Sequence, residues 1–152
     1  LQQRMLVAAD NDSITSPADI QNGDFKVATQ KGTTNYELAV SLFGADKVDA
    51  YDQFDFAIAA VISGDADASI VDEVAGLGYM GANKDKVKLV GEGLQTDPLG
   101  FAFPDGSPLV AVVNEGLAYM KDNGKLQEIN DKFFSPGFTV TYDDIAEVTY
   151  DE

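Results

Sequence analysis

Residues 30–35, QKGTTN, are the short segment of this sequence whose residue types best suit ligand binding. The segment lies between a short alternating stretch, FKVAT, and a helix-like stretch, YELAVSLFG. A helix N-terminus offers unpaired N–H groups and a partial positive charge. Gly32 allows close approach to the backbone, and the hydroxyls of Thr33 and Thr34 add donors and acceptors. Together they suit a carboxylate, although a plain helix cap with a tight turn remains the alternative. The phosphate-loop pattern G-x-x-x-x-G-K-[ST] is absent.

Asp72 is the second candidate, because it comes at the end of a predicted strand at 65–72. Ligands of parallel sheets bind outside the carboxyl ends of the strands, so we expect Asp72 and the QKGTTN segment to face one crevice. A carboxylate there can pair with a ligand ammonium, and the alternative is an N-cap for a helix at 73–83. A carboxylate site beside an ammonium site describes a free α-amino acid, with about 1.5–3 kcal/mol for each charge-assisted hydrogen bond.

Composition narrows the possible chemistry. The chain has 152 residues, 26 acidic and 10 basic, with a net charge of −16 and neither cysteine nor histidine. Such a charge repels nucleic acid and anionic membranes, so nucleic acid is not an expected partner. Missing histidine and cysteine remove the commonest general base, thiolate sites and cysteine nucleophiles. Asp65 and Asp67 lack calcium-loop spacing. We expect no metal, no cofactor and no enzymatic activity.

The elements that would position these residues alternate between strand and helix, which predicts an α/β fold with right-handed crossovers and a mostly parallel sheet flanked by helices. Thr34 or Asn35 is expected to cap the helix that starts near residue 36, and Asp52 the next one. The expected strands are 1–9, 25–29, 47–51, 65–72, 87–91 and 99–104, and the expected helices are 36–43, 52–64 and 73–83.

The C-terminal part has a different pattern. Ser107 and Pro108 suit the start of a helix. A clear apolar stripe follows at helical spacing, and it consists of Leu109, Val112, Val113, Gly116, Leu117 and Met120. A second short amphipathic helix is expected up to residue 133. Residues 138–152 are acidic, and either add an edge strand or form a solvated tail.

Three stretches in this order resemble the C-terminal part of family 3 extracellular solute-binding proteins, the polar amino-acid-binding components of ABC importers. They are ADIQNGDFKVATQKGTTNYELA, DQFDFAIAAVISGDADASIVDE and VKLVGEGLQTDPLGFAFPDGSPLVAVVNEGLAYMKDNGKLQEINDKFF. The resemblance covers about residues 1–135. It implies a periplasmic-binding-protein type II fold, in which two α/β lobes joined by two hinge strands close on the ligand.

The resemblance also implies a division of the chain. Residues 1–9 would be a hinge strand, 10–98 the second ligand-binding lobe, 99–104 the return hinge strand, 105–137 helices that normally dock on the first lobe, and 138–152 an acidic tail. The body of the first lobe, with its carboxylate-binding arginine and aromatic residues, has no match here. The fragment is therefore expected to bind amino acids weakly or not at all, and the helix stripe to fold back or to pair with another copy as a homodimer.

Roles for individual residues follow from the same resemblance. Thr33 would bind the ligand α-carboxylate with help from Thr34 beside Gly32, and Asp72 would hold the α-ammonium. The side chain of the ligand would be faced by Gln30 and Val71. The expected partners are an amino acid and a membrane permease, and the expected location is extracytoplasmic. An extracytoplasmic sensor domain and a dehydratase of the same fold are the alternatives, and the sequence does not identify the amino acid.

Overall fold

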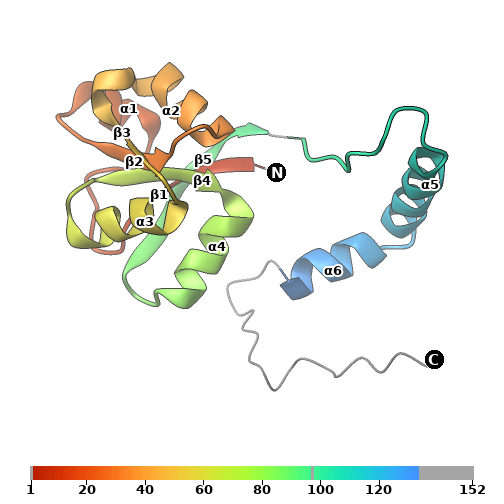
Figure 1. The fold of residues 1–152 in the computed structure, drawn as a ribbon. Helices are drawn as coiled ribbons and strands as arrows, with labels where there is room; N and C mark the ends of the chain where they lie inside the picture. The colour runs from red at the N-terminus through yellow and green to blue at the C-terminus, as the bar shows by residue number, and fades with distance from the viewer. Residues whose placement is uncertain (1, 97, 134–152) are drawn as a thin grey trace, which may run out of the picture.

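A five-stranded sheet in the strand order β3-β2-β4-β1-β5 forms the centre of the molecule. The computed structural model describes residues 2–96 and 98–133 (Figure 1). The strands are β1 (Gln2–Ala8), β2 (Val27–Gln30), β3 (Val48–Tyr51), β4 (Ala68–Asp72) and β5 (Val87–Thr96). This confirms the predicted α/β class and the single-lobe architecture.

The sheet is mixed rather than mostly parallel. Strand β2 pairs in parallel with both β3 and β4, as expected for strands joined by crossover helices. Strand β1 pairs antiparallel with β4 on one side and with β5 on the other. The chain thus enters and leaves the sheet along two adjacent strands, with the parallel strands beyond them.

Helices cover both faces of the sheet, as Figure 1 shows. Helices α1 (Pro17–Asn22) and α2 (Thr34–Phe43) lie on one face, and α3 (Phe54–Ser63) and α4 (Glu73–Ala82) lie on the other. A short 3₁₀ turn at Ala45–Lys47 leads into β3.

Each face has its own apolar cluster because the central strands alternate between them. Met5 and Ile70 point toward α1 and α2, whereas Leu6 and Val71 point toward α3 and α4. Each of these side chains is at most 1% exposed, and full burial of such a side chain contributes about 1.5–3 kcal/mol. Burial on both faces fixes the register of the strands and so the positions of their ends.

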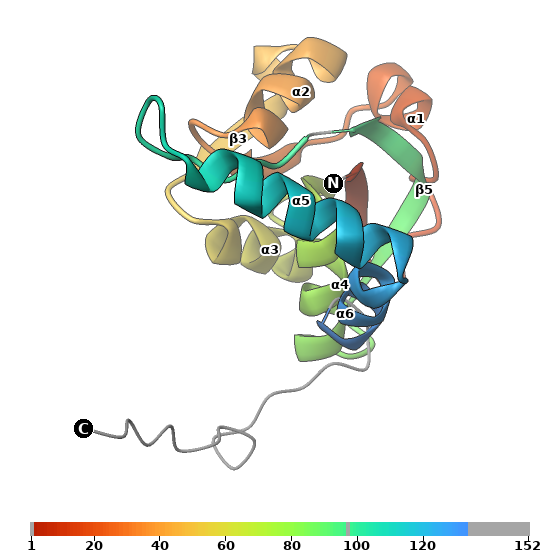
Figure 2. The same cartoon turned by 90° about the vertical axis from the view of Figure 1, so that its right-hand side faces the viewer.

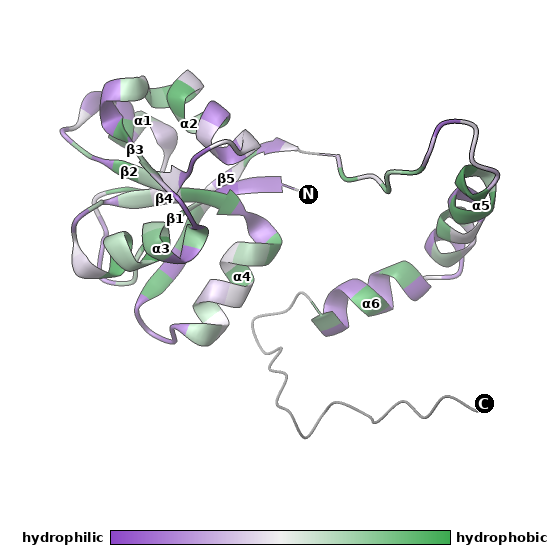
Figure 3. Cartoon of the chain, viewed as in Figure 1, coloured by the Kyte–Doolittle hydropathy of each residue, from purple (hydrophilic) through white to green (hydrophobic). Residues whose placement is uncertain are grey.

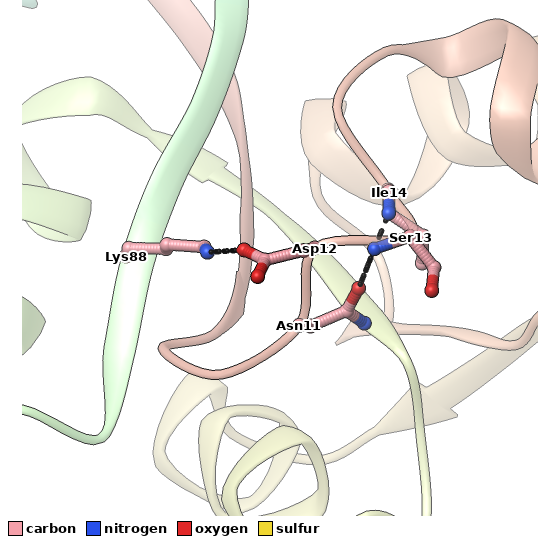
Figure 4. A network of polar contacts seen from close by, with 5 residues as sticks. All are labelled: Asn11, Asp12, Ser13, Ile14 and Lys88. Atoms are coloured by element: carbon pink, nitrogen blue, oxygen red, sulfur yellow. Dashed lines mark hydrogen bonds and ion pairs between the residues drawn. The ribbon is translucent and has the colours of Figure 1, made fainter.

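The loop after β1 is held in place by three polar contacts, drawn in Figure 4. The Asn11 Oδ1 atom accepts hydrogen bonds from the backbone N–H groups of Ser13 at 3.0 Å and Ile14 at 3.1 Å. The next residue, Asp12, pairs with Lys88 Nζ on β5 at 2.8 Å, and the hydrogen bond from Lys88 lowers the pKa of that carboxyl. The turn brings Ile14 into the core, where it is fully buried.

Several predicted element boundaries were wrong. Residues 99–104 form no strand, and β5 instead extends to Thr96. Helix α2 is capped by Thr33 rather than by Thr34 or Asn35. The N-cap position of α3 is Gln53 rather than Asp52, and its side chain makes no capping hydrogen bond. The correction at α2 matters for function, because it moves Asn35 from the cap into the buried face of the helix.

Helices α5 (Leu109–Asp122) and α6 (Lys125–Phe133) follow an extended segment and stand apart from the sheet in Figure 1. Figure 2 looks from their side, with both helices in front of the other elements. They pack mainly on each other. Figure 3 shows their apolar stripes, and Leu109 and Val112 are 55% and 63% exposed. No helix in the described ranges is both long and apolar enough to cross a membrane. The expected boundaries of hinge strands, lobe and docking helices remain predictions, and the tail at 138–152 lies outside the described residues.

Candidate functional site

The two candidate segments meet at one edge of the sheet. Strands β2 and β4 are parallel neighbours, so Gln30 and Asp72, their last residues, lie at the same end. The Asn35 Nδ2 group on the first turn of α2 donates to Asp72 Oδ1 at 3.4 Å. The predicted juxtaposition of the QKGTTN segment with Asp72 is therefore confirmed, and ligand binding there stays a prediction.

Thr33 is the N-cap of α2. Its Oγ1 atom accepts a hydrogen bond from the Tyr36 N–H at 3.2 Å and donates one to the Gln30 carbonyl oxygen at 2.7 Å. The capping alternative for this side chain is thus realised. The helix still directs its N-terminal dipole toward the edge of the sheet, and a capped N-terminus of this kind remains suited to an anion.

A glycine is needed at position 32 because of its backbone conformation, and not because a side chain would clash with neighbouring atoms. Its φ is +70°, in the left-handed region that other residues adopt rarely. A Cβ atom built at Gly32 would have no atom within 4 Å. The turn between β2 and α2 is therefore open to solvent on this side, and it carries the chain from the strand into the helix cap.

Asp72 is the N-cap residue of α4 by position, but its side chain makes no capping hydrogen bond. The carboxylate, which is half-buried, instead accepts from Asn35 across the gap between α4 and α2. An ionised carboxylate has several acceptor sites, so one amide donor does not exhaust it. This arrangement favours a binding role for Asp72 over the simple capping alternative.

A buried polar network supports this edge, and most of it was missed by sequence reasoning. Gln3 on β1 is fully buried and lies opposite Asp72 in the β1–β4 register. Its Nε2 group donates to Thr34 Oγ1 at 3.2 Å and to Asn35 Oδ1 at 3.0 Å. Asn35 itself is only 3% exposed. These contacts join residues about thirty positions apart, which no local pattern reveals.

The two residues expected to face the ligand side chain, Gln30 and Val71, differ in how far they are buried. Gln30 is half-buried, and its Nε2 group donates to the backbone oxygen of Asp52 at 3.0 Å, beside an ion pair between Lys31 and Asp52. Val71 is fully buried in the cluster under α3 and α4. The expectation that the Val71 side chain faces a ligand is wrong in this structure, because both faces of β4 are covered.

The cations near this edge are already paired. Arg4, the only arginine of the chain, donates through one amino group to Glu73 Oε1 at 2.7 Å and through the other to the Gly91 carbonyl oxygen at 2.7 Å. Lys31 pairs with Asp52. Within the described part of the chain, no group of three acidic or other metal-binding side chains could hold a metal ion. A ligand carboxylate would thus rely on the α2 N-terminus.

A large apolar hollow lies elsewhere, between α4, the segment that follows β5, and helices α5 and α6. Its lining includes Val74, Phe101, Val113, Leu117 and Leu126. It contains few polar groups that could orient a zwitterion. Its apolar lining matches the exposed stripe of α5, and we do not count it as part of the polar site.

Comparison with known proteins identifies relatives of this lobe. No protein-family model matches the sequence. The chain is 32% identical over 127 residues to the L-cystine-binding protein TcyA of Bacillus subtilis, which covers 82% of this chain and 46% of that protein. It is 31% identical over 137 residues to the L-cystine-binding protein TcyJ of Escherichia coli K12, covering 88% of this chain and 50% of that protein. The chain spans about half the length of these curated relatives.

Solved structures give the same result. A binding component of an ABC transporter from Wolinella succinogenes, complexed with lysine, superposes with a TM-score of 0.75 at 27% identity, over 88% of this chain and 58% of that one. An ancestral amino acid-binding protein that is a precursor of cyclohexadienyl dehydratase superposes with a TM-score of 0.73 at 34% identity, over 88% and 57%. The chain is therefore homologous to bacterial amino-acid-binding proteins of the solute-binding class, over about half of their length, and has the periplasmic-binding-protein type II fold.

Proposed function

We propose that this chain is one lobe of an amino-acid-binding protein that captures its ligand without catalysis and delivers it to the permease of an ABC importer. The observation that carries the proposal is the position and hydrogen bonding of the Asp72 carboxylate. This carboxylate occupies a helix N-cap position without capping, and is held by Asn35 beside the N-terminus of α2. An acceptor for an ammonium and a helix N-terminus for a carboxylate thus lie at one edge, which matches the two charged groups of a free amino acid.

In this proposal the N-terminus of α2, with Thr33 and Thr34 beside Gly32, binds the α-carboxylate, and Asp72 binds the α-ammonium. Gln30 lies nearest to where a ligand side chain would extend. The Val71 side chain does not contact the ligand in this proposal. Val71 only helps to fix the end of β4 that carries Asp72. The relatives named for cystine and the structure that contains lysine make these two amino acids the first to test.

Affinity of the lobe alone should be low. Two groups of charge-assisted hydrogen bonds contribute about 1.5–3 kcal/mol each, and they must offset the entropy lost on association. With Arg4 and Lys31 already paired, no free cation adds to the carboxylate site. A net gain of at most about 4 kcal/mol corresponds to a dissociation constant of about 1 mM or weaker.

The rest of the proposal concerns a longer protein. We assign 1–9 and 99–104 to two hinge crossings, 10–98 to the second lobe, and 105–137 to helices that dock on a first lobe, followed by the tail at 138–152. Closure of two lobes on the ligand would then remove the zwitterion from water. The exposed apolar stripe of α5 supports a docking role for these helices. The family resemblance of the sequence is the basis on which we propose an extracytoplasmic location.

A dehydratase is the second candidate, because the ancestral precursor of cyclohexadienyl dehydratase is among the similar structures. Such an enzyme needs an acid–base group in its cleft. Asp72 is the carboxylate at this edge with a free binding position, and the chain contains no histidine or cysteine. The binding function is favoured because Asn35 donates to one oxygen of Asp72 and leaves the other to accept from a ligand ammonium.

The test is a titration of the ¹⁵N-labelled chain with single amino acids, including L-cystine and L-lysine, followed by amide chemical shifts, which detect millimolar binding. The proposal expects saturable shifts at residues 32–35 and at Asp72 with at least one amino acid. It expects these shifts to disappear in Asp72→Asn, while Asp65→Asn, at an exposed turn, serves as the matched control. Unchanged spectra with every amino acid would contradict the proposal, and turnover of the added compound would favour the enzyme.

A further inference from the structure

Gln3 is a polar side chain in an apolar position, and it is not explained by the proposed ligand contacts. It lies on β1 with no exposed surface. Its Nε2 group makes two hydrogen bonds, to Thr34 Oγ1 and to Asn35 Oδ1. Its Oε1 atom, however, is buried without a hydrogen-bond partner. A buried unsatisfied oxygen is rare in proteins and calls for a physical reason.

The reason lies at the other end of the network. An ionised carboxylate only accepts hydrogen bonds, so Asn35 must turn its Nδ2 group toward Asp72. The Oδ1 atom of Asn35 then faces Gln3, so Gln3 must donate a hydrogen bond to it from its own amide nitrogen. Turning either amide around would bring two oxygen atoms together. The unpaired Oε1 atom of Gln3 is thus the consequence of a chain of donors that ends on Asp72.

The position of Gln3 in the sheet suits this task. Gln3 is the direct register partner of Asp72 in the antiparallel β1–β4 pair. The following residue, Arg4, reaches Glu73 at 2.7 Å. Successive strand residues point to opposite faces, so β1 holds the junction between β4 and α4 from both sides of the sheet. The β1–β5 pairing is also irregular between Gln3 and Met5, which is typical of strands that orient a side chain for function.

We propose that Gln3 is a positioning residue that fixes the orientation of the Asn35 amide and thereby holds one oxygen of Asp72, leaving the other oxygen for a ligand ammonium. The role of Asp72 toward a ligand ammonium rests on the proposed amino-acid site. The dependence of the Asn35 and Asp72 orientations on Gln3 does not. It predicts that removal of the Gln3 donor frees the Asn35 amide to rotate, and that Asp72 loses its fixed direction although it remains present.

The experiment compares Gln3→Met, which keeps the length of the side chain and removes both donors, with Gln95→Met. Gln95 is the register partner of Gln3 on β5 and is exposed, so it is the matched control. Nuclear Overhauser contacts between the Asn35 side-chain amide protons and the Asp72 β-protons report the network without any ligand. We expect them in the unaltered chain and in Gln95→Met, and expect their loss in Gln3→Met.

The second readout is affinity for glycine, the smallest probe with both charged groups. Gln3→Met should weaken glycine binding by about tenfold, the equivalent of one hydrogen bond to a charged group. Persistence of the Asn35–Asp72 contacts in Gln3→Met, or unchanged glycine affinity after their loss, would overturn the inference. Failure of the unaltered chain to bind glycine or any other amino acid would instead overturn the proposed function, and the contacts alone would then decide whether Gln3 positions Asp72.

If Gln3→Met does not fold, Gln3→Asn serves as the second variant. Its side chain keeps the donors but is shorter by one methylene group, which draws them back toward β1 and away from the Asn35 oxygen that Gln3 reaches at 3.0 Å. The inference expects the same loss of the Asn35–Asp72 contacts. An intact network in this folded variant would contradict the proposed dependence on Gln3.

Discussion

Replacement of Thr33 by alanine tests whether the QKGTTN turn is held as the structure describes. The Thr33 hydroxyl accepts from the Tyr36 N–H at 3.2 Å and donates to the Gln30 oxygen at 2.7 Å. Alanine removes both hydrogen bonds and leaves the Tyr36 donor at the helix N-terminus without its cap. Loss of an N-cap side chain costs about 0.5–2 kcal/mol, and the second bond places Thr33→Ala in the upper half of that range, at about 1–2 kcal/mol.

The assay is urea denaturation followed by far-ultraviolet circular dichroism. Thr33→Ala should lower the midpoint at an unchanged slope, because the folded surface stays the same. For a lobe of this size the melting temperature should fall by about 4–8 °C for each kcal/mol. Thr33→Ser keeps the hydroxyl and should stay within about 0.5 kcal/mol of the unaltered chain.

Two results would refute this reasoning. Equal stability of Thr33→Ala and the unaltered chain would mean that the cap contributes nothing. Equal destabilisation by alanine and serine would mean that the methyl group of Thr33, and not its hydroxyl, is what stabilises the turn. In either case the geometry assigned to the α2 N-terminus would be incorrect, and the carboxylate site proposed there would lose its support.

Further predictions concern other parts of the chain. Gly32→Ala should destabilise by about 1–2 kcal/mol in urea denaturation, since its φ of +70° is left-handed and the space around it is open; no change would contradict a strained turn. Ile70→Ala should cost about 2–5 kcal/mol, because Ile70 is fully buried, and a cost below about 1 kcal/mol would argue against the packing of β4. Burial, and secondarily a hydrogen bond to Asp55, raises the pKa of Tyr79 to about 12. Because the pKa is raised in the folded chain, protonated Tyr79 contributes to the free energy of unfolding. This contribution is complete below the ordinary tyrosine pKa of about 10 and is lost as the pH rises toward 12. Ultraviolet titration against Tyr79→Phe should show that Asp55→Asn lowers this pKa, and an unchanged curve would rule the contact out. Sedimentation equilibrium should show self-association that Leu109→Glu abolishes, and a monomer at high concentration would contradict pairing through the exposed stripe of α5.

The parts of the site that depend on short-range order could be predicted from the sequence. A glycine and two threonines between a strand and a helix indicated a capped helix N-terminus. Asp72 between a strand and a helix indicated a second helix N-terminus, although its side chain does not cap that helix. Parallel strand ends share an edge of the sheet, so the meeting of these two segments followed from local patterns alone. Even so, the capping residue was misplaced by one position, because Thr33, Thr34 and Asn35 are all acceptable caps.

The parts that depend on contacts distant in sequence could not be predicted. Nothing near Gln3 in the sequence indicates that it lies opposite Asp72, since that contact follows from the antiparallel pairing of β1 with β4. The family resemblance placed Val71, beside Asp72, against the ligand side chain, but its side chain is fully buried because helices cover both faces of β4. The apolar segment at 99–104 has a pattern typical of a strand, yet no neighbouring strand in the described sheet pairs with it.

A comparison of three ligands on the ¹⁵N-labelled chain tests directly whether the ends of β2 and β4 bind the two charged groups of an amino acid. They are the amino acid that gives the largest response, its N-acetyl derivative, which lacks the ammonium, and its carboxamide, which lacks the carboxylate. We expect the free amino acid to shift both residues 32–35 and Asp72, and each blocked derivative to bind at least about tenfold more weakly. The N-acetyl derivative should lose the response at Asp72, and the carboxamide the response at Thr33. Equal binding of all three ligands, or shifts confined to other parts of the lobe, would contradict the proposed site.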